Sequence, residues 1–123
     1  MRIVTRPDFD GIVCAALLKE VYPIQEPILW AEPGDMQRGR VTVNDGDIIA
    51  NLPYHENCAL WFDHHYSAKI DNPFEGIYQI APSAAGLVYN YLEDKLPSGF
   101  GELIRETDRI DSAYLTLDEV LHP

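Results

Sequence analysis

The sequence predicts an α/β protein of three layers, in which a mostly parallel sheet carries helices on both faces. Two observations support this class. The segments DIIANL (47–52) and CALWFDH (58–64) are short and almost continuously apolar, which is typical of strands covered on both faces in a parallel sheet. Helix-like segments lie among the strand-like ones, and this alternation predicts right-handed crossovers. The length of 123 residues suits one domain with one core.

The elements of the first two thirds of the chain follow from local patterns. Residues 1–5 are expected to form a strand. Residues 11–21 are apolar around most of a helical circumference and predict a buried helix that ends at Tyr22 and Pro23. Further strands are expected at PILWAE (27–32), DIIANL (47–52), CALWFDH (58–64) and YQI (78–80), whereas MQRGRVTV (36–43) is ambiguous.

The last third predicts helices. Ser83 is a suitable cap for a helix over residues 83–96, which carry apolar residues at helical spacing. Residues 100–121 predict one helix followed by a short one that Thr116 caps.

Composition and charge narrow the class of protein. No apolar run reaches the roughly 20 residues of a membrane span, and no basic leader opens the chain, so we expect a cytoplasmic protein. The formal net charge of −11 argues against a broad surface for extended nucleic acid. Carboxylates that hold divalent cations fit this acidic balance better. Cys14 and Cys58 lie in apolar segments without CxxC spacing and are expected to be free thiols.

Polar side chains gather at one end of the expected strands. In an open parallel sheet, ligands bind beyond the carboxyl ends of the strands. The polar residues at carboxyl ends are Asp8, Asp10, Asn51, Asp63, His64 and His65. Asp45 and Asp47 lie at the opposite end of their strand. The first set is therefore expected to converge in one pocket, and the second is not.

This mixture of carboxylates and imidazoles suits Mn²⁺, Mg²⁺ or Fe²⁺ better than a structural zinc site. Two such ions clamp the attacking and leaving oxygens of a phosphoryl group. Simpler interpretations stay open, because an Asp-x-Asp after a strand also serves as a turn or a helix cap, and a solvated acidic edge needs no ligand.

Three motifs resemble a known family. RPDFDG (6–11), FDHH (62–65) and PSAAGLVYNYL (82–92), in this order, resemble the N-terminal domain of the DHH phosphoesterases over essentially the whole chain. That family includes family II inorganic pyrophosphatases, exopolyphosphatases, single-strand exonucleases and phosphodiesterases of oligonucleotides or cyclic dinucleotides. Its members hydrolyse phosphoanhydride or phosphodiester bonds with a pair of manganese ions, or with magnesium or cobalt.

The resemblance implies roles for single residues. Asp8 and Asp10 would each ligate one ion, and His64 would join Asp10 on the second ion. His65 would face the substrate phosphate or support proton transfer, and Asp63 would hold the tautomer of a histidine.

The resemblance also implies one further metal ligand late in the chain. Asp108 is the favoured residue and Asp111 the less favoured one. The segment RETDRID (105–111) equally fits the solvated face of a helix.

Two residues depart from the family's pattern. Arg6 takes the place of a histidine ligand, and Asn51 takes the expected place of the Asp that bridges the two ions. Arginine cannot ligate a cation, and an amide cannot neutralise two dications. We therefore expect one well-held ion, Mn²⁺ or else Mg²⁺ or Co²⁺, with Asn51 as a further ligand. Arg6 would either contact a substrate phosphate as a catalytic group or form a salt bridge to Asp8 or Asp10.

The family pairs this domain with a smaller C-terminal domain that binds substrate. Residues 1–123 are therefore expected to be the N-terminal part of a longer protein that lacks that domain here. Two functions remain in view: a metal-dependent phosphohydrolase that acts on a small phosphoanhydride or short phosphodiester, which we favour, and a degenerate domain that binds a metal, a nucleotide or a protein partner without hydrolysis. The sequence does not indicate an oligomeric state.

Overall fold

The computed structural model describes residues 1–121, except for the side chains of Ser67 and of residues 114–121. Five parallel strands form one sheet in the order β2-β1-β3-β4-β5. The strands are β1 (Ile3–Thr5), β2 (Leu29–Trp30), β3 (Ile48–Ala50), β4 (Leu60–Asp63) and β5 (Gly76–Tyr78). The chain moves to opposite sides of β1 to form β2 and β3, so a topological switch point lies between β1 and β3.

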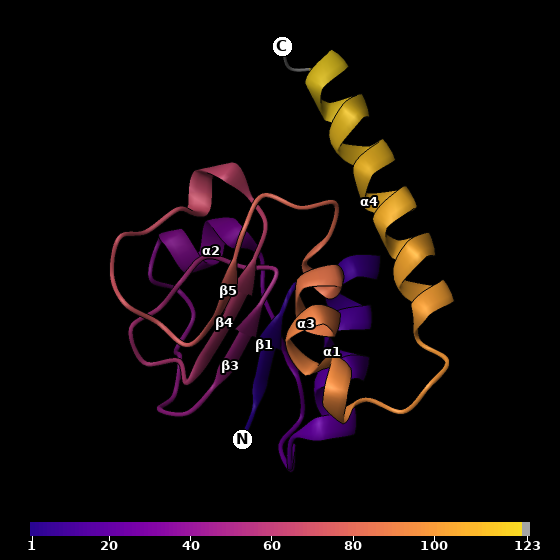
Figure 1. Cartoon of the computed structure of the whole chain (residues 1–123). Coiled ribbons are helices and arrows are strands. Elements are labelled where there is room, and N and C mark those ends of the chain that lie inside the picture. Colours follow the sequence, from indigo (N-terminus) through magenta and orange to yellow (C-terminus); the bar gives the residue numbers. More distant parts are fainter. Residues whose placement is uncertain (122–123) are drawn as a thin grey trace.

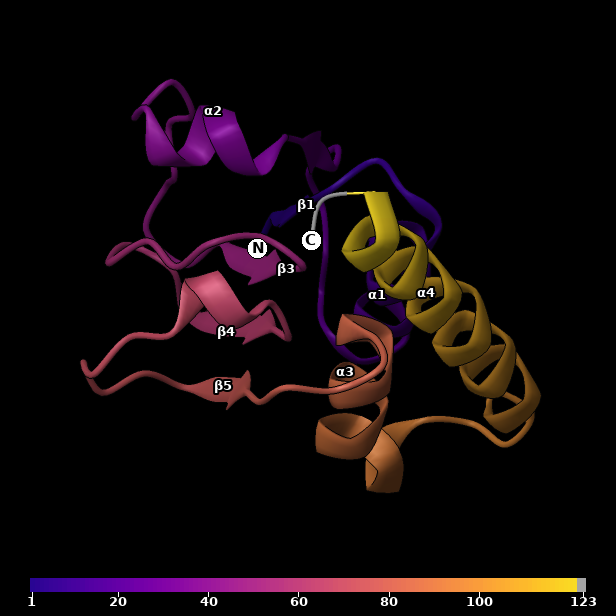
Figure 2. The same ribbon diagram turned by 90° about the horizontal axis from the view of Figure 1, so that it is seen from above.

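Helices lie on both sides of the sheet (Figures 1 and 2). One face is covered by α1 (Phe9–Val21) and α3 (Ala84–Leu92), and α4 (Gly101–Leu121) packs on these two helices. The other face is covered by α2 (Pro33–Gln37), the 3₁₀ turn η1 (Tyr66–Ala68) and loops. A second 3₁₀ turn, η2 (Glu93–Lys95), follows α3. The predicted α/β class is confirmed, with helices of very unequal length on the two faces.

Each face of the sheet has its own apolar cluster. The larger cluster joins β1, β3 and β4 to α1 and α3, with Leu17, Leu18 and Phe62 fully buried at its centre. The smaller cluster is built around Trp61, whose ring stacks on Tyr78 at a centroid distance of 5.4 Å. The indole N–H of Trp61 donates to the Leu52 carbonyl at 2.8 Å, so its polar atom is satisfied inside the cluster. The sheet is thus held from both sides.

Helix α1 begins in very close contact with the end of β1. The Asp8 side chain caps the helix by accepting a hydrogen bond from the Gly11 N–H at 2.8 Å. A Cβ atom at Gly11 would lie 1.9 Å from the Arg6 carbonyl oxygen. Only glycine therefore allows the helix to start so near the strand, and this proximity places Asp10 at the edge of the sheet.

Three local expectations differ from the structure. Residues 100–121 do not form two helices, because α4 runs from Gly101 to Leu121 without a break. The fifth strand begins two residues before YQI. The short helix α2 (Pro33–Gln37) includes only the first two residues of the ambiguous region 36–43. Cys14 and Cys58 are free thiols, as expected.

Within residues 1–121, no helix combines the length and the apolar character that crossing a membrane would require. The second half of α4 extends past the carboxyl edge of the sheet (Figure 1).

Candidate active site

The carboxyl ends of three neighbouring strands bring the candidate residues together. Asp8 and Asp10 follow β1, Asn51 follows β3, and Asp63 and His64 lie at the end of β4. These strands are adjacent in the sheet, and β1 and β3 flank the switch point. This is the position at which open α/β sheets bind their ligands.

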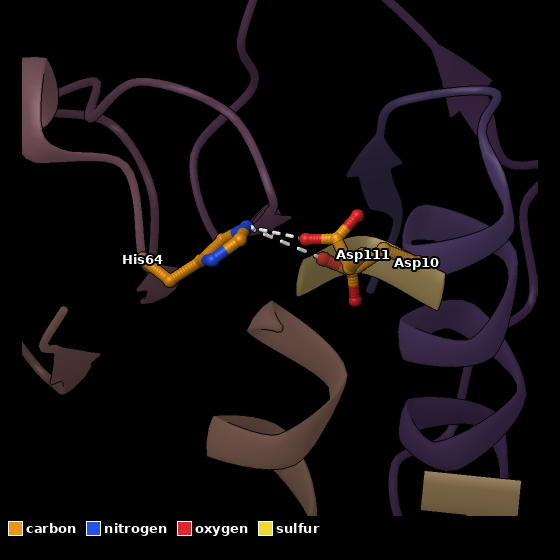
Figure 3. A group of neighbouring side chains, drawn as sticks. All are labelled: Asp10, His64 and Asp111. Carbon is orange, nitrogen blue, oxygen red and sulfur yellow. Dashed lines mark ion pairs between the residues drawn. The ribbon is translucent and has the colours of Figure 1, made fainter. Parts of the chain in front are cut away.

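His64 is buried, and its ring points toward two carboxylates. Its Nδ1 lies 2.9 Å from the Ala81 carbonyl oxygen, which can only accept, so Nδ1 carries a proton. Its Nε2 lies 3.4 Å from Oδ2 of Asp10 and 3.3 Å from Oδ2 of Asp111 (Figure 3). This Nε2 is buried and has no hydrogen-bond partner among the described residues. When the ring is neutral, the lone pair of Nε2 therefore faces the carboxylates of Asp10 and Asp111.

Asp10 is held by the first turn of α3. Its Oδ2 accepts from the Ala84 N–H at 2.9 Å, and its Oδ1 accepts from the Ala85 N–H at 2.8 Å. Ser83 caps the same turn by accepting from the Gly86 N–H. The small residues of this turn let the helix N-terminus lie directly against the carboxylate. Asp10 is thus positioned by two elements far apart in the sequence.

Burial raises the pKa of Asp10 to about 6 from its usual value of 3.8. The two N–H donors of α3 and the neighbouring His64 lower this pKa, while the nearby Asp111 carboxylate raises it. The pKa of Asp111 is also raised, first by burial and, against the effect of His64, by Asp8. A site in which carboxylates resist ionisation lacks positive charge, and a bound cation would supply it.

The structure places Asp111, and not the favoured Asp108, beside His64. Oδ1 of Asp108 instead accepts a hydrogen bond from the Ser83 hydroxyl. Asp108 therefore supports the cap of α3, whereas Asp111, one turn further along α4, reaches the His64 ring.

The three residues Asp10, His64 and Asp111 fit a divalent cation. Each offers one ligand atom, and these atoms lie within 4.8 Å of one another. Two carboxylate oxygens and one imidazole nitrogen form a ligand set that suits Mn²⁺ and related ions. Three protein ligands also leave coordination positions open, which is typical of catalytic rather than structural sites.

Asp8 is bound by protein donors and does not belong to this group. The Asn51 side-chain amide donates to its Oδ1 at 3.0 Å, in addition to the Gly11 N–H. Arg6 lies 3.7 Å from its Oδ2 and donates to Glu32 at 3.2 Å. Of the two roles left open for Arg6, the structure thus shows the salt bridge to Asp8. Asp8 itself acts as a helix cap, which was the simpler interpretation of the Asp-x-Asp motif.

Asn51 is buried and has the left-handed backbone angle φ = 62°. Its Nδ2 donates a hydrogen bond to Asp8, and its Oδ1 is buried without a hydrogen-bond partner among the described residues. An amide can donate to Asp8, which a carboxylate cannot do without a proton or a metal between the two groups.

Asp63 and His65 form a second pair at the end of β4. Oδ1 of Asp63 lies 2.6 Å from Nδ1 of His65 and also accepts from the His64 N–H at 2.9 Å. Desolvation lowers the pKa of His65, but the hydrogen bond and the charge of Asp63 outweigh it, and the pKa is raised. Asp63 therefore orients the ring of His65 and favours its protonated form.

A pocket of about 260 Å³, here called the Asp10 pocket, lies beside this cluster of residues, and Asn51, Asp63 and His64 do not line it. It is lined by Arg6, Asp8, Phe9, Asp10, His65, Thr107, Ile110 and Asp111. Ile110 and Asp111 lie three and four positions after Thr107 on α4, so one face of this helix closes the pocket. Which face this is depends on how α4 is rotated against α1 and α3, and the N–H donors of Ala84 and Ala85 are backbone groups, so the sequence alone reveals neither feature.

This chain, with its parallel sheet and its acidic and histidine-containing site, is similar to a phosphodiesterase of known structure. That enzyme is PggH from Vibrio cholerae, described as a pGpG-specific phosphodiesterase, which shares 43% identity with this chain at a TM-score of 0.77. The match covers 98% of this chain and 40% of PggH, so the chain spans less than half the length of that enzyme. No family model matches the chain, and no curated protein matches it. The resemblance to a phosphodiesterase therefore holds for both sequence and fold.

Proposed function

We propose that this chain is the metal-holding domain of a DHH-type phosphodiesterase that hydrolyses short phosphodiesters such as the linear dinucleotide pGpG. The observation that carries the proposal is the buried, unpartnered Nε2 of His64, which lies 3.3–3.4 Å from two carboxylates. The 43% identity to PggH favours a phosphodiester over a phosphoanhydride as the substrate.

Asp10, His64 and Asp111 would hold one divalent ion, with the unpartnered Oδ1 of Asn51 as a further oxygen ligand. Mn²⁺ is the first choice, with Mg²⁺ or Co²⁺ as alternatives. When bound, the ion would supply Lewis-acid polarisation of the phosphoryl group and activation of a water molecule. We propose no second ion, because the Asp8 carboxylate already accepts a hydrogen bond from the Asn51 amide and forms an ion pair with Arg6.

Two cationic side chains would bind the phosphate. The side chain of Arg6 is 39% exposed and lines the pocket, so its guanidinium can contact a phosphate oxygen while Glu32 holds its position. His65, whose protonated form Asp63 favours, would donate its proton to the oxygen of the leaving group. Water would supply the group that replaces this oxygen on phosphorus.

The Asp10 pocket is smaller than the roughly 300–1,000 Å³ typical of sites that enclose a whole small molecule. It fits the phosphate and part of a nucleotide. We therefore propose that a further domain completes substrate binding, and the 40% coverage of PggH supports a two-domain arrangement.

Binding without hydrolysis is the second candidate. It is favoured by the contacts of Arg6 and Asn51 with Asp8, which replace a metal-ligand set with a salt bridge and an amide hydrogen bond.

The test is hydrolysis of pGpG by the full-length protein in the presence of Mn²⁺. We expect wild type to release GMP, chelation to abolish the reaction, and His64→Ala to lower kcat/KM at least about 100-fold. His55→Ala is the matched control, because His55 lies in the β3–β4 connection, lines neither pocket, and its ring accepts a hydrogen bond from the Asn57 N–H. Activity that survives both chelation and His64→Ala would refute the proposal, and tight binding without turnover would select the second candidate.

A further inference from the structure

A second pocket adjoins the Asp10 pocket on the side of α2. It has a volume of about 240 Å³ and is called here the Gln37 pocket. It is lined by Arg6, Pro33, Gln37, Pro53, Asp63, His65 and Ala68. Arg6 and His65 line both pockets, so the two pockets meet at these side chains.

The far wall of the Gln37 pocket is apolar and stiff, with one polar group. The rings of Pro33 and Pro53 and the methyl group of Ala68 offer flat apolar surface with little side-chain entropy to lose on binding. The Gln37 side chain is exposed, and its amide takes part in no hydrogen bond among the described residues. This wall can therefore pack against a ring and offer it one donor and one acceptor.

Glu32 connects this pocket to the phosphate-binding groups. It directly precedes α2 and accepts a hydrogen bond from Nε of Arg6 at 3.2 Å. Because Arg6 lines both pockets, this contact holds the guanidinium at their boundary.

We infer that the Gln37 pocket binds the second nucleoside of a short phosphodiester substrate, which deepens the proposed function and depends on it. A phosphodiester carries two organic groups on one phosphorus, so its site needs two compartments that meet at the anion. The two pockets have similar volumes and share Arg6 and His65. The phosphate lies at their boundary, one nucleoside contacts Phe9 and Ile110 in the Asp10 pocket, and the other contacts the prolines and the Gln37 amide.

The test fills the Gln37 pocket from its exposed side with Gln37→Trp. Gln25→Trp is the matched control, since Gln25 is an exposed glutamine in the α1–β2 connection and lines neither pocket. We expect Gln37→Trp to raise KM for pGpG about 10-fold or more, the size of effect that loss of one base contact produces, with little change in kcat. A methyl ester of GMP, which needs only one pocket, should show no more than about a two-fold change by the same reasoning.

A binding measurement separates this inference from the proposed function. A phosphorothioate analogue of pGpG that resists hydrolysis should bind wild type and Gln25→Trp equally and Gln37→Trp about 10-fold more weakly. The isosteric variant Gln37→Glu, which adds a negative charge near the phosphate without added bulk, should also weaken binding. Absence of turnover with this binding pattern intact would contradict only the proposed function. Equal affinity of Gln37→Trp and Gln25→Trp, or no binding of the analogue to wild type, would overturn the inference.

Discussion

Asp10 shows how one residue can combine a structural and a chemical role. Both of its oxygens accept backbone N–H groups from α3, and one of them also faces His64. The N–H donors hold the carboxylate in place, whereas burial raises its pKa to about 6. The residue is therefore oriented for a cation but is poorly stabilised as an anion when no cation is bound.

The titration of Asp10 follows from this imbalance. Because its folded pKa of about 6 lies above the usual 3.8, the metal-free folded state binds more protons between these values than the unfolded state does. This contribution to stability is complete below about pH 4 and is lost as the pH rises through 6, with a total of about 3 kcal/mol. NMR of the Asp10 side-chain carbon should show a midpoint near 6 without metal. A midpoint near 4 would contradict the account.

Asn51 is the second residue whose chemistry decides the site. Replacement by Asp would set a carboxylate against Asp8, where the amide now donates at 3.0 Å. We expect Asn51→Asp to lower the free energy of unfolding by about 3 kcal/mol without metal, and to raise Mn²⁺ affinity about 10-fold or more. Thermal unfolding with and without Mn²⁺ measures both effects. Asn90→Asp makes the same charge change at an exposed position of α3 and should alter neither quantity. An unchanged Mn²⁺ affinity in Asn51→Asp would show that residue 51 does not face the cation.

At the scale of elements, the site depends on two helix N-termini that lie close to their neighbours. Helix α1 starts against β1 because Gly11 has no side chain, and α3 starts against Asp10 because its first turn consists of small residues. The sequence motifs RPDFDG and PSAAG are thus requirements of packing as well as of chemistry.

Substitution of Gly11 tests this packing. Gly11→Ala would put a methyl group 1.9 Å from the Arg6 carbonyl oxygen, so the start of α1 must shift. We expect a loss of at least about 2 kcal/mol in the free energy of unfolding and weaker Mn²⁺ binding. Gly101→Ala, where the new atom would meet only the end of the Arg105 side chain at 3.7 Å, should be neutral or slightly stabilising. Equal stabilities of the two variants in chemical denaturation would contradict the role of Gly11.

The same scale explains what the sequence could predict. Apolar runs located β3 and β4, and the polar residues that follow them were correctly expected at one edge of the sheet, since strand direction alone determines this. The choice between Asp108 and Asp111 depends on how α4 is rotated against α1 and α3, which is a tertiary property. The N–H donors to Asp10 are backbone groups, and no side-chain pattern records them.

At the scale of the whole molecule, the carboxylates at the two ends of the sheet have different partners. The cluster of Asp10, His64 and Asp111 lies at the carboxyl edge of the sheet, whereas at the amino end of β3 Asp47 is paired with Arg2 at 2.6 Å. Asp47 thus has an arginine as its ion-pair partner, whereas Asp10 and Asp111 bring two carboxylates to one histidine ring and concentrate negative charge at the carboxyl edge. A divalent cation at the carboxyl edge would reduce this charge and create a surface that attracts phosphate.

Calorimetric titration of Mn²⁺ into the 123-residue chain, with Asp111→Asn and Asp108→Asn as a matched pair, tests the central claim most directly. Both variants remove one charge from the same helix, but only Asp111 faces His64, whereas Asp108 accepts from Ser83. The account expects one site in wild type, binding weakened about 10-fold or more in Asp111→Asn, and binding within about two-fold of wild type in Asp108→Asn. Loss of binding in Asp108→Asn with full binding in Asp111→Asn, or two equivalent sites in wild type, would contradict it.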